Sequence, residues 1–286
     1  MKLSCLPVSF FAEIISGKMT LGDWARMGVE LGLDAIDLSI LFVPDRSPQT
    51  VTRLRDRIES AGIGIAMVTS YPDFTHPDAC QRAKELELEI DVVETAHRLG
   101  AKMVRVTAGQ AHPGLGKDDG ICWAVEGLSG LAERVRGSGV QLVYENHAKP
   151  GAWQYADFSQ PPDIFLEIAR QTASAPLGIN FDTGNAAAFA ADPLLLLQAV
   201  IGRVISLHAS DSSTHGALNH CLLGTGITPF AQLFSYLKQQ GWDGWICMEE
   251  ASNLGRNGVE KAAAFVRSTW SASGARRSFP AHQVGF

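Results

Sequence analysis

The sequence predicts an α/β fold, a single (β/α)8 TIM barrel, and three observations lead to it. Eight short β-type runs recur along the 286 residues, and most are continuous apolar stretches, as in parallel strands that are covered on both faces. Segments with helical spacing lie between them. No linker-like stretch divides the chain, so the strands and helices form eight consecutive units in about 270 residues.

The strands and helices are predicted from local signals. A doubly wound sheet would normally carry a glycine fingerprint after its first strand, and PVSFFAEIISGK has none. Helices end at glycine just before the next strand, as in HRLGAKMVRV. The predicted strands begin at Leu3, Asp34, Gly64, Lys102, Val140, Leu177, Val204 and Trp245. Helix starts are indicated by Thr20 with Asp23, Ser47 before Pro48, Pro161 with Pro162, Asp192 before Pro193, and Thr228 before Pro229.

Composition excludes several classes of protein. With 46% hydrophobic residues the chain can build a large core, and its net charge of −6 offers no basic footprint for nucleic acid or anionic lipid. No segment approaches the roughly 20 apolar residues of a membrane span. Five cysteines without a CxxC motif indicate reduced thiols and a cytoplasmic protein. We expect residues 1–270 to form the barrel and residues 271–286 a C-terminal tail, which lies on the surface or reaches a neighbouring subunit of a homo-oligomer.

Polar side chains end four consecutive predicted strands. Glu145 ends the fifth strand in VYENH, Asp182 the sixth in INFDTGN, His208 the seventh in SLHASD, and Glu249 the eighth in ICMEE. Their separations of 37, 26 and 41 residues are about one unit each, so the four groups are expected to meet at the catalytic end of the barrel. Three carboxylates and an imidazole suit one divalent ion, Mn²⁺, Mg²⁺ or Co²⁺, with Zn²⁺ less favoured.

A plainer interpretation exists for each of these residues. Carboxylates at strand ends often cap the helix that follows, so any one of them alone says little about a metal. Glu145 and Asp182, however, follow apolar runs that should be buried, where an uncompensated carboxylate is costly. Four such residues in consecutive units therefore indicate a metal centre. Because side chains alternate along a strand, His147 is expected to face the same cavity as Glu145.

These motifs carry a family resemblance. VYENH, INFDTGN, SLHASD, GTG from Gly224 and GWDGWICMEE resemble, in order and spacing, the xylose-isomerase-like TIM barrels, a family of sugar phosphate isomerases and epimerases. The likeness covers nearly the whole chain. It implies that Glu145, Asp182, His208 and Glu249 bind one divalent metal. Glu249 is preferred to Glu250 because the family's glutamate stands five residues after the glycine of WDG.

The resemblance also implies a reaction. A metal chelated by a carbonyl and a neighbouring hydroxyl acidifies the C–H bond and stabilises the enediolate that deprotonation creates. The expected function is a metal-dependent isomerase or epimerase acting on a sugar or sugar phosphate. Similar ketose 3-epimerases use both metal-bound glutamates as the acid–base pair, here Glu145 and Glu249. His147 is a further candidate base, because an imidazole pKa of about 6.5 suits proton abstraction at neutral pH.

The sequence departs from the ketose 3-epimerases at several positions. Gly151 stands where they have a second glutamate, Asn185 where they have a histidine, and Thr214 where they have an arginine. Ser210 stands where many relatives carry a lysine. These departures make ketohexose epimerisation less favoured. The residues predicted to bind substrate are Arg105, His76, Asn185 and Trp153, with Tyr155 beside it; Arg105 could instead neutralise Glu145 or Asp37, and the loop aromatics could simply pack at the rim.

Two other functions stay open on the sequence. One is a metal-dependent dehydratase of keto-inositol or dehydroshikimate type, built on the same four ligands. The other is a catalytically silent sugar-binding barrel. DNA-repair endonucleases of the same superfamily need a histidine-rich multi-metal site and a basic groove, which Asn185 and the acidic balance disfavour. The expected partner is a small sugar or sugar phosphate, not a nucleic acid or a membrane.

Overall fold

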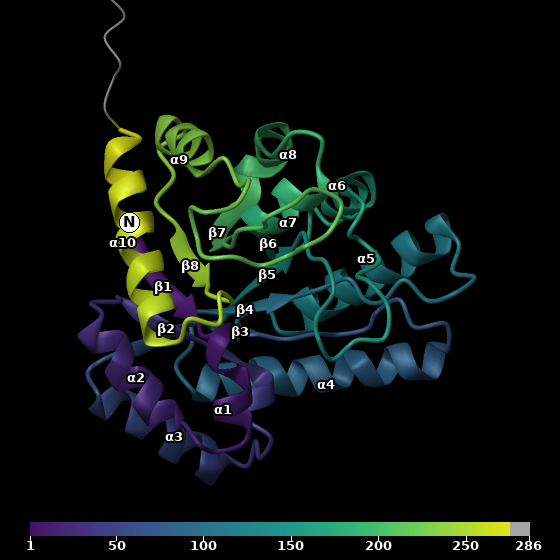
Figure 1. Cartoon of the computed structure of the whole chain (residues 1–286). Helices are drawn as coiled ribbons and strands as arrows, with labels where there is room; N and C mark the ends of the chain where they lie inside the picture. The colour runs from purple at the N-terminus through teal and green to yellow at the C-terminus, as the bar shows by residue number, and fades with distance from the viewer. Residues whose placement is uncertain (275–286) are drawn as a thin grey trace, which may run out of the picture.

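The computed structural model describes residues 1–274, and it is a nearly closed (β/α)8 barrel, which confirms the predicted fold (Figure 1). All strand pairs are parallel, in the order β1-β8-β7-β6-β5-β4-β3-β2. At the seam between the first two strands, the Leu3 amide donates to Asp34 Oδ2 at 2.8 Å, and the Asp34 amide donates to the Leu3 carbonyl at 2.9 Å. The strands are β1 (Lys2–Leu6), β2 (Ala35–Ser39), β3 (Gly64–Thr69), β4 (Met103–Val106), β5 (Gln141–Glu145), β6 (Leu177–Asp182), β7 (Val204–Ala209) and β8 (Trp245–Glu249).

Helices surround the strands and begin where the capping signals predict (Figure 1). Thr20 and Asp23 form a reciprocal capping box, and the Asp192 side chain accepts from the first amides of its helix. The longer helices are α2 (Leu21–Glu30), α3 (Pro48–Ser60), α4 (Ala79–Arg98), α5 (Lys117–Arg134), α6 (Pro162–Gln171), α8 (Pro193–Val200), α9 (Phe230–Gln239) and α10 (Arg256–Ala272). Shorter ones are η1 (Val8–Phe10), α1 (Phe11–Ile15), η2 (Ile40–Phe42), α7 (Thr183–Phe189) and η3 (Ile201–Arg203).

Two apolar clusters place the polar residues at one end of the barrel. The large cluster lies between strands and helices, and a smaller one includes Met103, Val143 and Cys247 inside the barrel. Since side chains alternate along a strand, the residues two positions further on share the interior face. These are Arg105, Glu145 and Glu249, so a charged layer lies above the apolar floor, toward the carboxyl ends of the strands.

Helix α10, the last element of the described structure, continues to Ala272, and its apolar face packs on the core through Val259, Ala263 and Val266. Residues 275–286 of the predicted tail lie outside the described residues. Within residues 1–274, no helix combines the length and the hydropathy needed to cross a membrane.

Candidate metal centre

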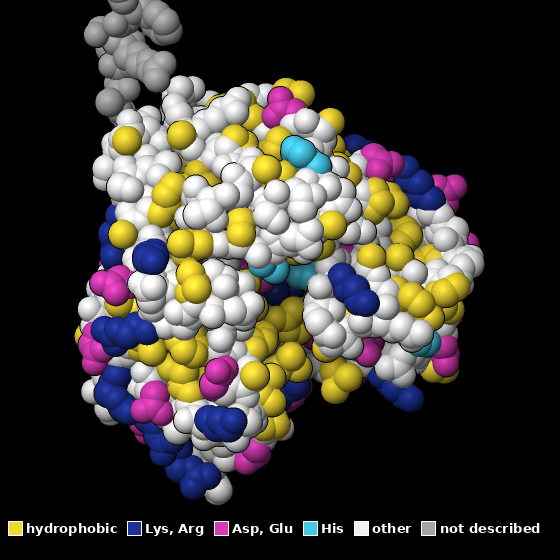
Figure 2. All heavy atoms as spheres, viewed as in Figure 1, with side chains coloured by type: hydrophobic (Ala, Val, Ile, Leu, Met, Phe, Trp, Pro, Cys, Tyr) yellow, Lys and Arg dark blue, Asp and Glu magenta, His cyan; other side chains and the backbone are white. Residues whose placement is uncertain are grey.

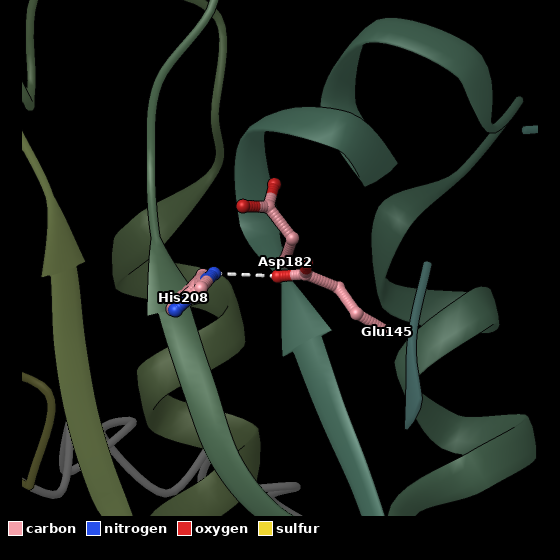
Figure 3. A group of neighbouring side chains, drawn as sticks. All are labelled: Glu145, Asp182 and His208. Carbon is pink, nitrogen blue, oxygen red and sulfur yellow. Dashed lines mark ion pairs between the residues drawn. The ribbon is translucent and has the colours of Figure 1, made fainter. Parts of the chain in front are cut away.

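Three of the four predicted ligands come together at the ends of neighbouring strands. The strand register places Asp182 opposite His208, and Glu145 opposite Asn180, two residues before Asp182. One ligand atom each from Glu145, Asp182 and His208 lies within 4.8 Å of the other two, and all three residues are buried (Figure 3). The three side chains converge on one space, as the spacing of the strand ends predicts.

Glu145 is held by neighbours on both sides. His208 Nδ1 lies 2.5 Å from Glu145 Oε1, which also accepts a hydrogen bond from Asn180 Nδ2 at 2.7 Å. Arg105 Nε lies 3.0 Å from Oε2, and both side chains are almost fully buried. Burial alone would raise the pKa of Glu145, but the charges of His208 and Arg105 outweigh it and hold the pKa below its ordinary value. Glu145 is therefore an anion.

Asp182 presents one occupied and one free oxygen. Its Oδ1 accepts from the Asn185 amide at 2.6 Å and from Ser210 Oγ at 2.8 Å, so this oxygen caps α7. Its Oδ2 is buried without a hydrogen-bond partner. Burial, and then the nearby charges of Glu249 and Glu145, raise the pKa of Asp182 well above its ordinary value. A dication beside Oδ2 would relieve this repulsion, so the free oxygen fits a metal ligand.

Asn146 and Ser210 position Asp182, a role that the sequence did not indicate. Asn146 Nδ2 donates to the Asp182 carbonyl, and the Asp182 amide donates to Asn146 Oδ1, both at 2.8 Å. Ser210 Oγ also accepts from the Gly184 amide at 3.0 Å, and a side chain at position 184 would collide with it. Ser210, where many relatives carry a lysine, thus fixes the Asp182 carboxylate and the start of α7.

Glu249, the last residue of β8, and Glu250, which follows it, point to different places. Glu249 lines the cavity above the centre, although it lies outside the group of three ligand atoms within 4.8 Å. Its charge is the second cause of the raised pKa of Asp182, which places it near that carboxylate. Glu250 is buried on the other side, where its Oε1 accepts from the Ser252 amide at 2.9 Å and lies against Gly258 of α10.

His147 faces Asp157, a carboxylate that no sequence pattern indicated. Its Nδ1 lies 3.7 Å from Asp157 Oδ2, and neither atom has a hydrogen-bond partner in the described structure. Asp157 Oδ1 is fixed by the Ser159 amide and hydroxyl, each at 2.7 Å. Burial first, and the charge of Arg105 second, lower the pKa of His147 to about 4. The ring is therefore neutral at pH 7 and lines the cavity with Glu249.

The residues predicted to bind substrate lie in three different settings. Asn185 lines the cavity, and its side-chain oxygen is buried without a partner. Arg105 pairs with Glu145, not with Asp37, which accepts from Ser4 Oγ at 2.7 Å. The Arg105 guanidinium also donates to the Ser70 carbonyl at 2.9 Å and lies over the Tyr71 ring. Its charge is thus engaged within the protein.

The two remaining predicted contacts, Trp153 and His76, lie behind or beside the cavity. Trp153 is 9% exposed and packs edge-on against His147, with ring centroids 6.5 Å apart. The ring of His76 packs against that of His112, with centroids 4.9 Å apart. In the same loop cluster Asp73 accepts a hydrogen bond from the Gln110 side chain and also contacts the His112 ring. Neither residue is among those lining the cavity.

The donor set fits a divalent metal ion. Glu145 and Asp182 offer carboxylate oxygens and His208 an imidazole nitrogen; His208 Nδ1 lies against Glu145 Oε1, and His208 Nε2 is buried without a hydrogen-bond partner. Carboxylates from adjacent barrel strands that share one site repel each other unless a cation neutralises them. A (β/α)8 barrel with such a centre at its carboxyl end defines a class of proteins that act on small molecules at the barrel mouth.

The comparisons with known proteins agree with this class. The model of the family described as "Xylose isomerase-like TIM barrel" matches residues 26–269, and the chain belongs to this family. A similar curated protein is the L-ribulose-5-phosphate 3-epimerase UlaE of Salmonella paratyphi B, 24% identical over 269 residues, which are 87% of this chain and 89% of the relative.

Solved structures share the same fold. The IOLI protein with a bound zinc atom aligns with a TM-score of 0.78 and 17% identity, covering 96% of this chain and 99% of its own. The probable 3-DHS dehydratase AsbF of Bacillus anthracis aligns with a TM-score of 0.72 and 15% identity, covering 93% and 99%. At these identities the likeness to the solved structures shows a shared fold.

Proposed function

We propose that this protein is a divalent-metal-dependent isomerase or epimerase of a sugar or a related polyhydroxy carbonyl compound. The observation that supports it most is the convergence of Glu145, Asp182 and His208 with one buried, unpartnered carboxylate oxygen of Asp182. The epimerase activity of a relative that matches 87% of the chain adds to it. The five free thiols are consistent with a cytoplasmic location.

The residues around the centre have separate proposed roles. Glu145, Asp182, His208 and Glu249 would hold the ion, with Mn²⁺ expected before Mg²⁺, Co²⁺ or Zn²⁺. The bound ion would polarise a substrate carbonyl and a neighbouring hydroxyl and so acidify the C–H bond beside them.

Two glutamate side chains would move the proton of the substrate C–H bond. Glu145 ends β5 and Glu249 ends β8, three strands further along the sheet, so one would remove a proton from one face of a carbon and the other would return it to the opposite face. Return to the neighbouring carbon gives an isomer instead of an epimer. Asn185 lines the same cavity and offers a hydrogen-bonding amide to a substrate hydroxyl.

A dehydratase is the second candidate, and the pair of His147 and Asp157 favours it. Loss of a β-hydroxyl needs an acid beside the leaving oxygen as well as a base beside the carbon. His147 is neutral, so it can protonate the leaving oxygen from the cavity wall only when Asp157, whose pKa burial raises well above its ordinary value, passes a proton to its Nδ1. The same histidine could also act as the base of an isomerase, so the product distinguishes the two functions.

The test is proton exchange in D₂O. The Mn²⁺-loaded protein would be incubated with ketoses, sugar phosphates, inososes and dehydroshikimate, and products followed by NMR and ultraviolet absorbance. Deuterium entering the carbon beside a carbonyl without loss of water supports the isomerase or epimerase. A conjugated carbonyl absorbance supports the dehydratase, and binding without either reaction supports a silent sugar-binding barrel. Glu145→Gln should lose the metal or the exchange; full activity in this variant would reject the assigned centre.

A further inference from the structure

The cavity above the metal centre has two chemically different ends. It encloses about 460 Å³. The end next to the centre is polar and includes His147, Asn185 and Glu249. The other end is a wall of apolar side chains from the segments after β1 and β2 and from the loop after β7: Val8, Phe11, Ile15, Leu41 and Leu218.

The apolar wall is unusually exposed for side chains of its kind. Ile15 is 59% exposed and Leu41 is 44% exposed, so two large apolar side chains of the wall face solvent. Figure 2 shows the hollow with histidine side chains inside it and hydrophobic side chains on the surface beside it, over α1. An exposed apolar patch that continues into a catalytic cavity is typical of a binding surface.

The lining offers little to a phosphate group. Among the lining residues, all within 1–274, Lys149 is the single Lys or Arg, and it lies exposed on the loop after β5. Phosphate is usually bound by arginine or lysine side chains or by the free amides at a helix start, and Lys149 alone supplies such a charge in this lining. Arg105, the nearest buried arginine to the centre, is already engaged by Glu145, Ser70 and Tyr71. Glu249 adds a negative charge to the polar end of the cavity.

We propose that the substrate is an unphosphorylated sugar derivative that carries a carbonyl group at the end next to the metal centre and an apolar substituent, such as an aryl or alkyl ether, at the other end. This inference rests on the proposed function, since it places the reacting end of the sugar between Glu145 and Glu249. The volume fits such a ligand, because it lies in the range of pockets for drug-sized molecules and exceeds what a bare sugar fills. The substituent lies on Ile15 and Leu41 and removes their apolar surface from water.

The test compares matched ligands on the full-length Mn²⁺-loaded protein by isothermal titration calorimetry. The ligands are the phenyl and methyl glycosides of glucose, galactose and xylose, which have no free carbonyl and therefore bind without reacting, together with glucose 6-phosphate. We expect phenyl to bind about ten-fold tighter than methyl for at least one sugar, because the ring buries apolar area on the wall. The phosphate should bind more weakly than that phenyl glycoside. A phenyl-to-methyl ratio near one for all three sugars, undetectable phenyl binding, or tightest binding of the phosphate would overturn the proposal.

Variants locate the contact. Ile15→Ser and Leu41→Ser change exposed side chains, so folding should be retained, and each should lower the phenyl-to-methyl ratio about three-fold. Leu195→Ser on α8, 62% exposed and outside the cavity, is the matched control and should leave the ratio unchanged. A ratio unaffected by both wall variants contradicts the subsite. If simple ketoses exchange protons but the phosphate binds best, the apolar subsite is rejected and the proposed function stands. If the wall variants behave as expected but no ligand exchanges protons, the proposed function is rejected and the subsite stands.

Discussion

The side-chain amide of Asn146 binds both backbone groups of Asp182. Its Nδ2 donates to the Asp182 carbonyl oxygen, and its Oδ1 accepts from the Asp182 amide, each at 2.8 Å. Asn146 directly follows Glu145, so this pair joins the ends of β5 and β6, which carry two of the predicted metal ligands. The distance between those ligands is thus set by a fixed side chain and not by a free loop.

Replacing Asn146 tests this link. Asn146→Ala leaves a buried N–H and a buried C=O unpaired, so the free energy of unfolding should fall by about 2 kcal/mol. The Mn²⁺ affinity should fall about ten-fold because Asp182 loses its fixed position. Urea unfolding and Mn²⁺ titration measure the two effects. Asn257→Ala, an exposed change in α10, is the control. An unchanged Mn²⁺ affinity in Asn146→Ala would show that Asn146 does not position Asp182.

Much of the fold could be predicted because its signals are local. All eight strands and the helices with caps or N1 prolines follow from apolar runs and punctuation by Pro and Gly. Helices α1 and α7 were not predicted, since five and seven residues are too few to show helical periodicity. The α7 helix starts at Asp182, whose Oδ1 caps it while Oδ2 stays free. The capping and metal-binding interpretations of this residue therefore need not exclude each other.

The site was predictable only where residues end strands. Glu145, Asp182 and His208 follow from that rule, because strand ends of a barrel share one rim. Asp157 did not, since it lies in the irregular segment between β5 and α6, where no repeat indicates direction. The choice of Arg105 between Glu145 and Asp37 also stayed open on the sequence, because it depends on the register and tilt of the strands.

Asp157→Asn should separate catalysis from metal binding. The variant keeps the oxygen that Ser159 contacts but replaces the ionisable oxygen facing His147 Nδ1 with an amide nitrogen. If His147 is a proton-transfer group, kcat for the best substrate should fall about 100-fold, while KM and Mn²⁺ content change little. Asp118→Asn, an exposed change in α5, is the control. Unchanged kcat would leave His147 and Asp157 as packing residues only.

Metal binding should release protons. In the metal-free protein Glu145 raises the pKa of His208 to about 9 against the lowering effect of burial, and the pKa of Asp182 is raised well above its ordinary value. His208 therefore carries a proton near pH 7 and must lose it to bind an ion, so Mn²⁺ affinity should rise with pH up to about 9. Titration in buffers of different ionisation enthalpy measures the release. Binding that is independent of pH between 6 and 9 would be inconsistent with these ligands.

The most direct test of the proposed centre is the Mn²⁺ stoichiometry of the purified protein and four variants, measured by electron paramagnetic resonance after equilibrium dialysis. We predict one ion per chain for the native protein, strongly reduced binding for Asp182→Asn, His208→Ala and Glu249→Gln, and one ion for Glu250→Gln, whose side chain faces Ser252. Native-like binding of one ion by Asp182→Asn, or no binding by the native protein at any pH up to 9, would contradict the account.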